Sequence, residues 1–174
     1  MNIISKTIEF DSAHRVPLHE SKCRNLHGHR YSMTVYLSGD LFESGPQSQM
    51  VFDYGFLKEI MMQNIDAFCD HALILSLKDD KFINMAYDEK LMDHIFYDWI
   101  EEISSTINEN SFWNGQTAFG KTYIINEYPT AESLAKHFFN ILNPKISEAT
   151  GNQAKLYSVV LKETPSSAAE YRLS

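Results

Sequence analysis

The stretch HGHRYSMTVYLS, residues 27–38, decides how the chain is expected to fold. Side chains of a β-strand alternate between the two faces of a sheet, so every second residue lies on the same side. From residue 29 onward, one face carries His29, Tyr31, Met33, Val35 and Leu37. The other face carries Arg30, Ser32, Thr34 and Tyr36. The pattern predicts a strand over 29–38 with one face toward the core.

Strands are also predicted on both sides of this stretch. Over 3–13, Ile4, Ile8 and Phe10 share one side, and His14 follows at the same period of two. Near the end of the chain, 155–164 is strand-like; the residues in phase are Tyr157, Val159, Leu161 and Glu163. A short final strand is expected to hold Tyr171 and Leu173.

Helical spacing fills the middle of the chain. A helix is expected behind Asp53, a suitable N-cap, and continues to Phe68. A second is predicted over 88–107, and a third after Pro129 and Thr130. Strands first, helices in the middle and strands last indicate an α+β fold, with helices on one face of an antiparallel sheet.

The composition is typical of one globular domain over 1–174. The chain has 174 residues, 44% of them hydrophobic, and a formal net charge of -8. This charge argues against a nucleic-acid partner, and no apolar run is long enough to span a membrane. The two cysteines, Cys23 and Cys69, do not make a disulfide scaffold. A cytoplasmic protein is expected.

Three histidines form a candidate metal site. His27 and His29 flank Gly28, so an extended chain points both imidazoles the same way. Gly28 is expected to leave room for the backbone to approach an ion. His14 ends the first strand, and antiparallel pairing would place it near the start of the second. Three nitrogen ligands with one open position are typical of catalytic zinc, although such a histidine pair also occurs by chance.

The remaining histidines are interpreted as surface or core residues: His19, His94 and His137. Beside the metal candidates, Cys23 is a candidate fourth ligand, nucleophile or general base, with a buried inert cysteine as the alternative. The adjacent pair Asp70 and His71 suits an acid–base relay, provided that a turn brings the side chains together. Glu163 could accept two hydrogen bonds from an amidine-like ligand edge, or could be a strand-end glutamate that reaches solvent.

Taken in order, six motifs resemble the family of 6-pyruvoyl- and 6-carboxy-tetrahydropterin synthases. They are FDSAH at 10–14, CRNLHGH at 23–29, VFDYGFLK at 51–58, DH at 70–71, PTAE at 129–132 and LKET at 161–164. The resemblance implies a T-fold, in which a four-stranded antiparallel sheet with helices on one side assembles into an oligomeric β-barrel. It also implies a homo-oligomer, trimer or hexamer, with active sites between subunits.

The resemblance further implies an enzyme, a zinc-dependent lyase acting on 7,8-dihydroneopterin triphosphate. By this likeness zinc is held by His14, His27 and His29. Cys23 would be the general base, with Asp70 and His71 as the proton relay. The expected substrate-binding residues are Glu163, which would anchor the pterin ring, Thr130 and Glu132.

The spacing of Cys23 from His27 resembles the bacterial 6-carboxy enzymes of queuosine biosynthesis. We therefore expect 6-carboxy-5,6,7,8-tetrahydropterin, acetaldehyde and triphosphate as products. The 6-pyruvoyl product is the first alternative. A non-catalytic pterin-binding T-fold protein and a guanine- or urate-type T-fold enzyme are the others.

One segment departs from the resemblance. The distance from His71 to Pro129 is longer than the family usually shows, which predicts an insertion within about 78–127. For the triphosphate, proximity to the histidines alone suggests Arg15, Lys22 and Arg24.

Overall fold

The structure, a computed structural model, describes residues 1–92 and 95–173. Its strands are β1 (Asn2–His14), β2 (His27–Gly39), β3 (Ala72–Ser76), β4 (Trp113–Thr117), β5 (Gly120–Ile125), β6 (Ala154–Thr164) and β7 (Ser167–Tyr171). Its α-helices are α1 (Tyr54–Met61), α2 (Ala67–Cys69), α3 (Asp80–Ala86), α4 (Phe96–Asn110) and α5 (Ala131–Ala149). A 3-10 turn, η1 (Lys22–Arg24), and a π-helical turn, η2 (Met62–Asp66), complete the elements. His94 falls outside the described residues.

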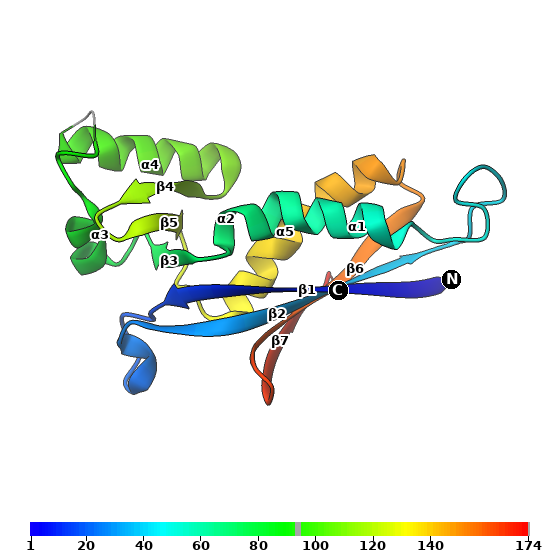
Figure 1. Cartoon of the computed structure of the whole chain (residues 1–174), viewed down its shortest axis with the longest axis horizontal. Helices are drawn as coiled ribbons and strands as arrows, with labels where there is room; N and C mark the ends of the chain where they lie inside the picture. The colour runs from blue at the N-terminus through cyan, green and yellow to red at the C-terminus, as the bar shows by residue number, and fades with distance from the viewer. Residues whose placement is uncertain (93–94, 174) are drawn as a thin grey trace.

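The predicted antiparallel sheet is present as β1, β2, β6 and β7, in that order (Figure 1). The predicted number of four strands is wrong for the whole sheet, because β3, β5 and β4 extend it beyond β1. The described residues form one seven-stranded sheet in the order β4-β5-β3-β1-β2-β6-β7. The β1–β3 and β3–β5 pairs are parallel, and β4 pairs antiparallel with β5. The sheet of one chain is open, so a closed barrel remains a prediction about an assembly.

The main core lies between the antiparallel strands and helices α1 and α5. The predicted inner face of β2 is buried, with Tyr31, Met33, Val35 and Leu37 all at 0% exposure. It packs with residues of the two helices that include Leu57, Met61, Leu134, Phe138 and Leu142. Burying such side chains contributes roughly 1.5–3 kcal/mol each, which makes this layer the main source of stability.

Among the described residues, the opposite face is covered by helices at the added strands. In β3, Ile74 belongs to the main core, whereas its neighbours Leu73 and Leu75 belong to a second cluster. That second cluster contains three buried residues of α4: Trp99, Ile103 and Ile107. Strands β3 and β5 are therefore buried on both faces.

The predicted insertion supplies α3, α4, β4 and β5. This group lies at the end of the sheet where β1 ends and β2 begins, at the left in Figure 1. The segment is part of the folded core rather than a loose surface loop. That this segment is an insertion, compared with other members of the family it resembles, stays a prediction.

Two of the predicted helix starts are confirmed. The Asp53 carboxylate accepts hydrogen bonds from the N–H groups of Gly55 and Phe56, and Thr130 Oγ1 accepts one from Ser133 N–H. The helix predicted over 88–107 begins later, at Phe96. The Asp88 side chain accepts from Lys90 N–H in a turn, which competes with helix formation there. No helix of the described residues is long and apolar enough to cross a membrane.

One residue of β6 does not have the predicted phase. A register shift opposite Tyr36 and Leu37 places Leu156, not Tyr157, on the buried side. An extra residue in one strand reverses the side chains that precede it. Val159 and Leu161 remain buried, and Glu163 follows on their side.

We predict that α4 contributes directly to stability. Ile103→Ala should lower the free energy of unfolding by about 2–5 kcal/mol, because it leaves a cavity in the second cluster. Met85→Ala in α3 is the control; its side chain is 50% exposed, and its effect should stay within about 0.5 kcal/mol. Urea unfolding at a fixed protein concentration measures both. Equal, small effects would show that α4 is dispensable for the fold.

Candidate metal centre

Antiparallel pairing brings three histidines together at one end of the sheet. His14, the last residue of β1, pairs with His27, the first of β2, as predicted, and His29 follows on the same face. The ring centroid of His14 lies 4.5 Å from that of His27 and 5.2 Å from that of His29. One nitrogen from each of the three rings lies within 4.8 Å of the others. This arrangement suits a single cation between them.

Main-chain carbonyl groups fix two of the imidazoles. His14 Nδ1 lies 2.7 Å from the carbonyl oxygen of Pro129, and His27 Nδ1 lies 2.8 Å from that of Asn25. A carbonyl oxygen only accepts, so each Nδ1 carries the hydrogen and each Nε2 keeps a free lone pair. Metal-binding histidines commonly have such a partner on the second nitrogen.

The innermost nitrogen, His14 Nε2, has no hydrogen-bond partner among the described residues. The His14 side chain is 2% exposed, and its Nε2 is buried without a hydrogen bond. A buried polar atom without a partner is costly, and a bound cation would satisfy it. Burial lowers the pKa of His14 to about 4, so the ring is neutral at physiological pH and able to bind a metal. These three side chains therefore fit zinc.

Gly28 has a different role from the one predicted. It lies between the histidines in sequence, but strand alternation turns it to the opposite face. A Cβ added at Gly28 would lie 3.0 Å from the carbonyl oxygen of Ser12 in β1. The glycine thus allows close approach of the two strands, not of an ion.

Glu163 lies beside the histidine cluster. Its Oε1 is 3.7 Å from His14 Nε2, and its side chain is 23% exposed. The carboxylate is therefore partly exposed at the edge of the cluster. It is close to the metal candidates, where it could meet a ligand bound there; its role as a pterin anchor stays a prediction.

Tyr31 is the nearest site residue that sequence reasoning missed. Its ring lies 5.8 Å from that of His14 and 5.6 Å from that of His29. Burial raises the pKa of Tyr31 well above its usual range, and the nearby Glu163 charge adds to this. The signal that could have identified Tyr31 is its hydroxyl group, which lies on the otherwise apolar face of the strand two positions after His29.

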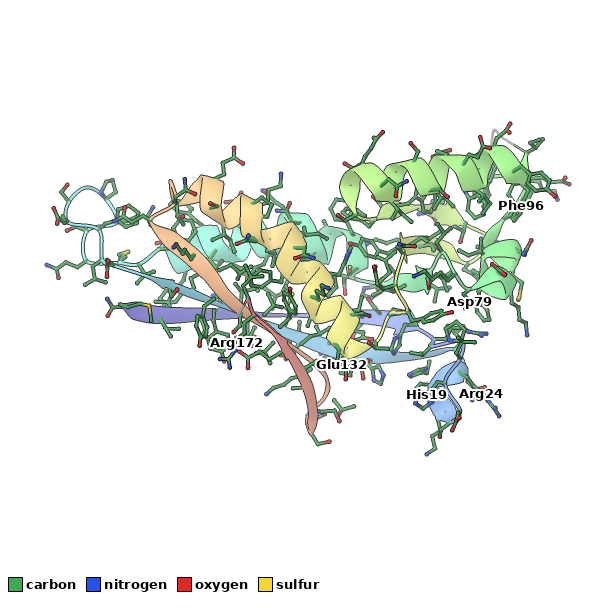
Figure 2. The ribbon with its side chains drawn as sticks, turned by 180° about the vertical axis from the view of Figure 1, so that it is seen from behind. His19, Arg24, Asp79, Phe96, Glu132 and Arg172 are labelled. Atoms are coloured by element: carbon green, nitrogen blue, oxygen red, sulfur yellow. The ribbon has the colours of Figure 1, made fainter. Side chains whose placement is uncertain are left out.

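Cys23 lies in η1, in the loop between β1 and β2. This loop extends past the end of the sheet, where Figure 2 labels His19 and Arg24. The Cys23 thiol is partly buried but does not join the three histidines as a metal-binding group among the described residues. The structure thus offers no support for Cys23 as a fourth ligand, and its role as a base remains a prediction.

The two residues predicted from the PTAE motif lie at the start of α5. Thr130 caps the helix, next to the Pro129 carbonyl that fixes His14. Glu132 is exposed in the first helical turn (Figure 2), where its charge suits the helix dipole. Both have structural functions here, and substrate binding by either stays a prediction.

Asp70 and His71 form a hydrogen-bonded pair, and the required turn is present. His71 has φ of +57°, a left-handed conformation, and its Nδ1 donates to Asp70 Oδ2 at 2.7 Å. The main-chain N–H of Asp11 donates to Asp70 Oδ1 at 3.0 Å. This hydrogen bond is the main reason that the pKa of Asp70 is lowered. The Asp70 carboxylate thus orients the imidazole.

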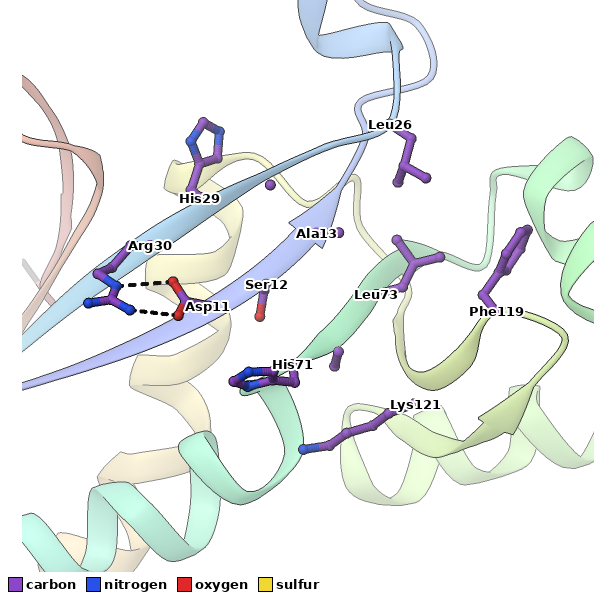
Figure 3. Close-up of a pocket in the computed structure, with 12 residues that line it drawn as sticks. Asp11, Ser12, Ala13, Leu26, His29, Arg30, His71, Leu73, Phe119 and Lys121 are labelled. Atoms are coloured by element: carbon purple, nitrogen blue, oxygen red, sulfur yellow. Dashed lines mark hydrogen bonds and ion pairs between the residues drawn. The ribbon is translucent and has the colours of Figure 1, made fainter.

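Within one chain this pair and the histidine cluster lie on different sides of the sheet. His71 lines a cavity of about 640 Å³ whose wall is formed mainly by outer-face residues of β1 and β2, such as Asp11 and Arg30, and which His29 of the cluster also borders. Figure 3 shows the His29 ring pointing away from His71. Within one subunit, the imidazoles of the cluster and of His71 therefore point in different directions.

Two ion pairs organise the charges near these sites. Arg30 binds Asp11 through two hydrogen bonds of 3.1 and 2.9 Å at the cavity wall. Arg15, a predicted phosphate contact, lies 3.0 Å from the Asp79 carboxylate and stacks over Phe82. Its charge is compensated within the protein, which leaves Lys22 and Arg24 as the predicted phosphate contacts.

The buried His137 belongs to the core. Its Nε2 lies 2.7 Å from the hydroxyl of Tyr123, and burial lowers its pKa to about 4. The prediction of a surface or core residue is confirmed for this histidine.

Comparisons with known proteins agree with the geometry. The sequence profile of a family described as 6-pyruvoyl tetrahydropterin synthase matches residues 3–174. A 6-carboxy-5,6,7,8-tetrahydropterin synthase of Haemophilus influenzae is 34% identical over 97% of both chains. One from Rickettsia bellii is 30% identical over 92% of this chain and 93% of its own length.

Solved structures show the same fold. An uncharacterised protein of Wolinella succinogenes has a TM-score of 0.70 at 25% identity, with 99% of this chain and 98% of that chain covered. The 6-pyruvoyl tetrahydropterin synthase of Caenorhabditis elegans has a TM-score of 0.59 at 23% identity, with 99% and 96% covered. The predicted fold class is thereby confirmed.

We predict that the purified chain binds one zinc ion per subunit and that His27→Ala and His29→Ala abolish this binding. Each substitution removes one of the three nitrogen ligands while leaving the buried His14 in place. Elemental analysis after zinc replenishment and dialysis measures the metal. His19→Ala, in the loop outside the cluster, is the control. Retention of one tightly bound zinc in both variants would contradict the assignment.

Proposed function

Because the chain belongs to the 6-pyruvoyl tetrahydropterin synthase family, we propose that it is a zinc-dependent lyase acting on 7,8-dihydroneopterin triphosphate. The proposed products are 6-carboxy-5,6,7,8-tetrahydropterin, acetaldehyde and triphosphate, for 7-deazapurine (queuosine) biosynthesis. The observation that supports zinc dependence most directly is that His14 Nε2 is buried without a hydrogen bond beside two further imidazoles. Family membership also confirms the prediction of an enzyme, a lyase of the tetrahydropterin synthase type.

The proposed reaction would take place at the histidine cluster. His14, His27 and His29 would hold the cation, and the hydrogen bonds to Pro129 and Asn25 keep two of these rings oriented. When bound, zinc would act as a Lewis acid that acidifies the C–H and O–H bonds of the substrate side chain.

Proton transfer is proposed for the remaining groups. Cys23 would remove a proton from the substrate side chain, and His71, oriented by Asp70, would carry protons to and from the reacting oxygens. Glu163 would accept hydrogen bonds from the amidine-like edge of the pterin. The pterin's own side chain, where the reaction takes place, would then point toward the histidines. Thr130 and Glu132, at the start of α5, are the further proposed contacts.

The carboxy product is favoured over the pyruvoyl product. The relatives that are 30% or more identical over most of the chain are named 6-carboxy-5,6,7,8-tetrahydropterin synthases. The compact spacing of Cys23 and His27 points the same way. The 6-pyruvoyl activity remains the second candidate, because the matching family profile carries that description.

A product assay tests the proposed reaction. Incubation of the zinc-loaded protein with 7,8-dihydroneopterin triphosphate should release acetaldehyde and triphosphate in equal amounts and form the 6-carboxy pterin. Removal of zinc by a chelator should stop turnover, and added zinc should restore it. Triphosphate release with a pyruvoyl product and no acetaldehyde would reverse the choice between the two activities. No turnover of any kind would favour a non-catalytic pterin-binding protein.

We further propose a homo-oligomer, trimer or hexamer, whose active sites lie between subunits. The separation of the histidine cluster from the Asp70–His71 pair across the sheet supports this arrangement. In a symmetric assembly, the pair of one subunit can face the cluster of the next.

Mixing two inactive variants tests the shared site. Cys23→Ala should keep its zinc but lose turnover, and His71→Gln should do the same. When the two proteins are unfolded, mixed and refolded together, some sites combine an intact Cys23 with an intact His71, and part of the activity should return. No recovery, in mixed oligomers verified by light scattering and mass spectrometry, would place both residues in the same subunit's site.

A further inference from the structure

We infer that Lys121 is a positioning residue for the Asp70–His71 pair. Its Nζ donates a hydrogen bond of 2.6 Å to the main-chain carbonyl of Asp70, which is the peptide unit that joins the two residues. Lys121 lies in β5, within the predicted insertion and outside all six motifs. The inference rests on the proposed function, in which Asp70 and His71 transfer protons.

The turn at His71 needs support from its surroundings. A non-glycine residue with φ of +57° is in a conformation that costs roughly 1–2 kcal/mol relative to the right-handed region. The protein holds this peptide from two sides. The His71 N–H donates to the Asp11 carbonyl at 2.7 Å, and the Asp70 carbonyl accepts from Lys121. The turn in which the His71 ring meets the Asp70 carboxylate is thus clamped between β1 and β5.

The position of Lys121 is set by its strand. It pairs with Gln116 of β4, and its side chain runs along the cavity wall toward the turn that carries His71 (Figure 3). Ordering a lysine side chain costs about 1.5–2 kcal/mol of rotamer entropy, which a charge-assisted hydrogen bond can offset. A lysine held in this way at the cavity is a defined part of the site.

Lys121 also contributes charge to the surroundings of Asp70. The carboxylate of Asp70 is faced by His71 next to it, by the Asp11–Arg30 ion pair of β1 and β2, by Asp66 of η2, and by Lys121 of β5. After the hydrogen bonds from Asp11 and His71, the Lys121 charge is among the causes that lower the pKa of Asp70. Removing that charge should raise this pKa.

Two substitutions at residue 121 separate positioning from bulk stability. Lys121→Met keeps the length and packing of the side chain but loses the hydrogen-bond donor and the positive charge. Lys121→Arg keeps a donor and the charge. The matched control is Lys155→Met, an exposed lysine at the start of β6, next to the far end of β2. Zinc content and melting temperature are measured for all three.

In the product assay, Lys121→Met should lower kcat on the order of 10- to 100-fold with little change in KM, because a misplaced acid–base group loses its alignment. The acid limb of its pH–rate profile should move to higher pH, as the pKa of Asp70 rises. Lys121→Arg should retain most of the activity and the original profile. Lys155→Met should match the unmodified protein.

Histidine NMR tests the inference without turnover. In protein labelled with ¹⁵N-histidine, the Nδ1–H of His71 bound to Asp70 should give a signal that is absent in His71→Gln. This signal should be lost or weakened in Lys121→Met and kept in Lys155→Met, whichever pterin reaction the enzyme performs. An unchanged signal in Lys121→Met would overturn the inference, as would an unchanged kcat and pH profile. A loss of activity accompanied by equal losses of zinc and melting temperature would also overturn it.

Discussion

The pairing of β1 with β2 is the constraint on which the rest of the site depends. Their register sets His14 opposite His27 and Ser12 opposite His29. Strand alternation then sends the three imidazoles to the core face and the Asp11–Arg30 pair to the outer face. A shift of one residue would exchange the two faces and disperse the cluster. The buried row from Tyr31 to Leu37 prevents such a shift, because it would expose the main core. Hydrophobic burial thus fixes the geometry of the polar site.

Elements distant in sequence complete this site through both main-chain and side-chain groups. The capped start of α5 brings the Pro129 carbonyl to His14, and the end of β6 brings the Glu163 carboxylate to the same ring. On the outer face, β5 reaches the Asp70 carbonyl through Lys121. The added strands β3, β5 and β4 therefore connect the second hydrophobic cluster to Asp70 and His71, the pair proposed for proton transfer. Changes in that cluster are expected to reach the chemistry through the position of this lysine.

The antiparallel strands and the histidine cluster could be predicted because their signals are local. Period-two alternation in 29–38 identifies β2, and the His-Gly-His triplet at its start needs only antiparallel pairing to meet His14. Strands β3 and β5 could not be predicted in this way. Their segments are short and buried on both faces, so they show no alternation that would distinguish them from a buried helix. Tyr157 was placed on the wrong face because a register shift leaves no periodic signal. Lys121 lies in no motif, and only the tertiary structure brings it to Asp70.

We propose that three imidazole nitrogens hold one cation and leave one coordination position open to a ligand. X-ray absorption spectroscopy of the zinc-loaded protein tests it most directly. The expected spectrum shows three imidazole nitrogens at about 2.0–2.1 Å from zinc, a light-atom neighbour that changes when a pterin is added, and no sulfur. A sulfur neighbour at about 2.3 Å would place a cysteine on the metal. That result, or fewer than three imidazoles, would show that His14, His27 and His29 do not form the metal site as proposed.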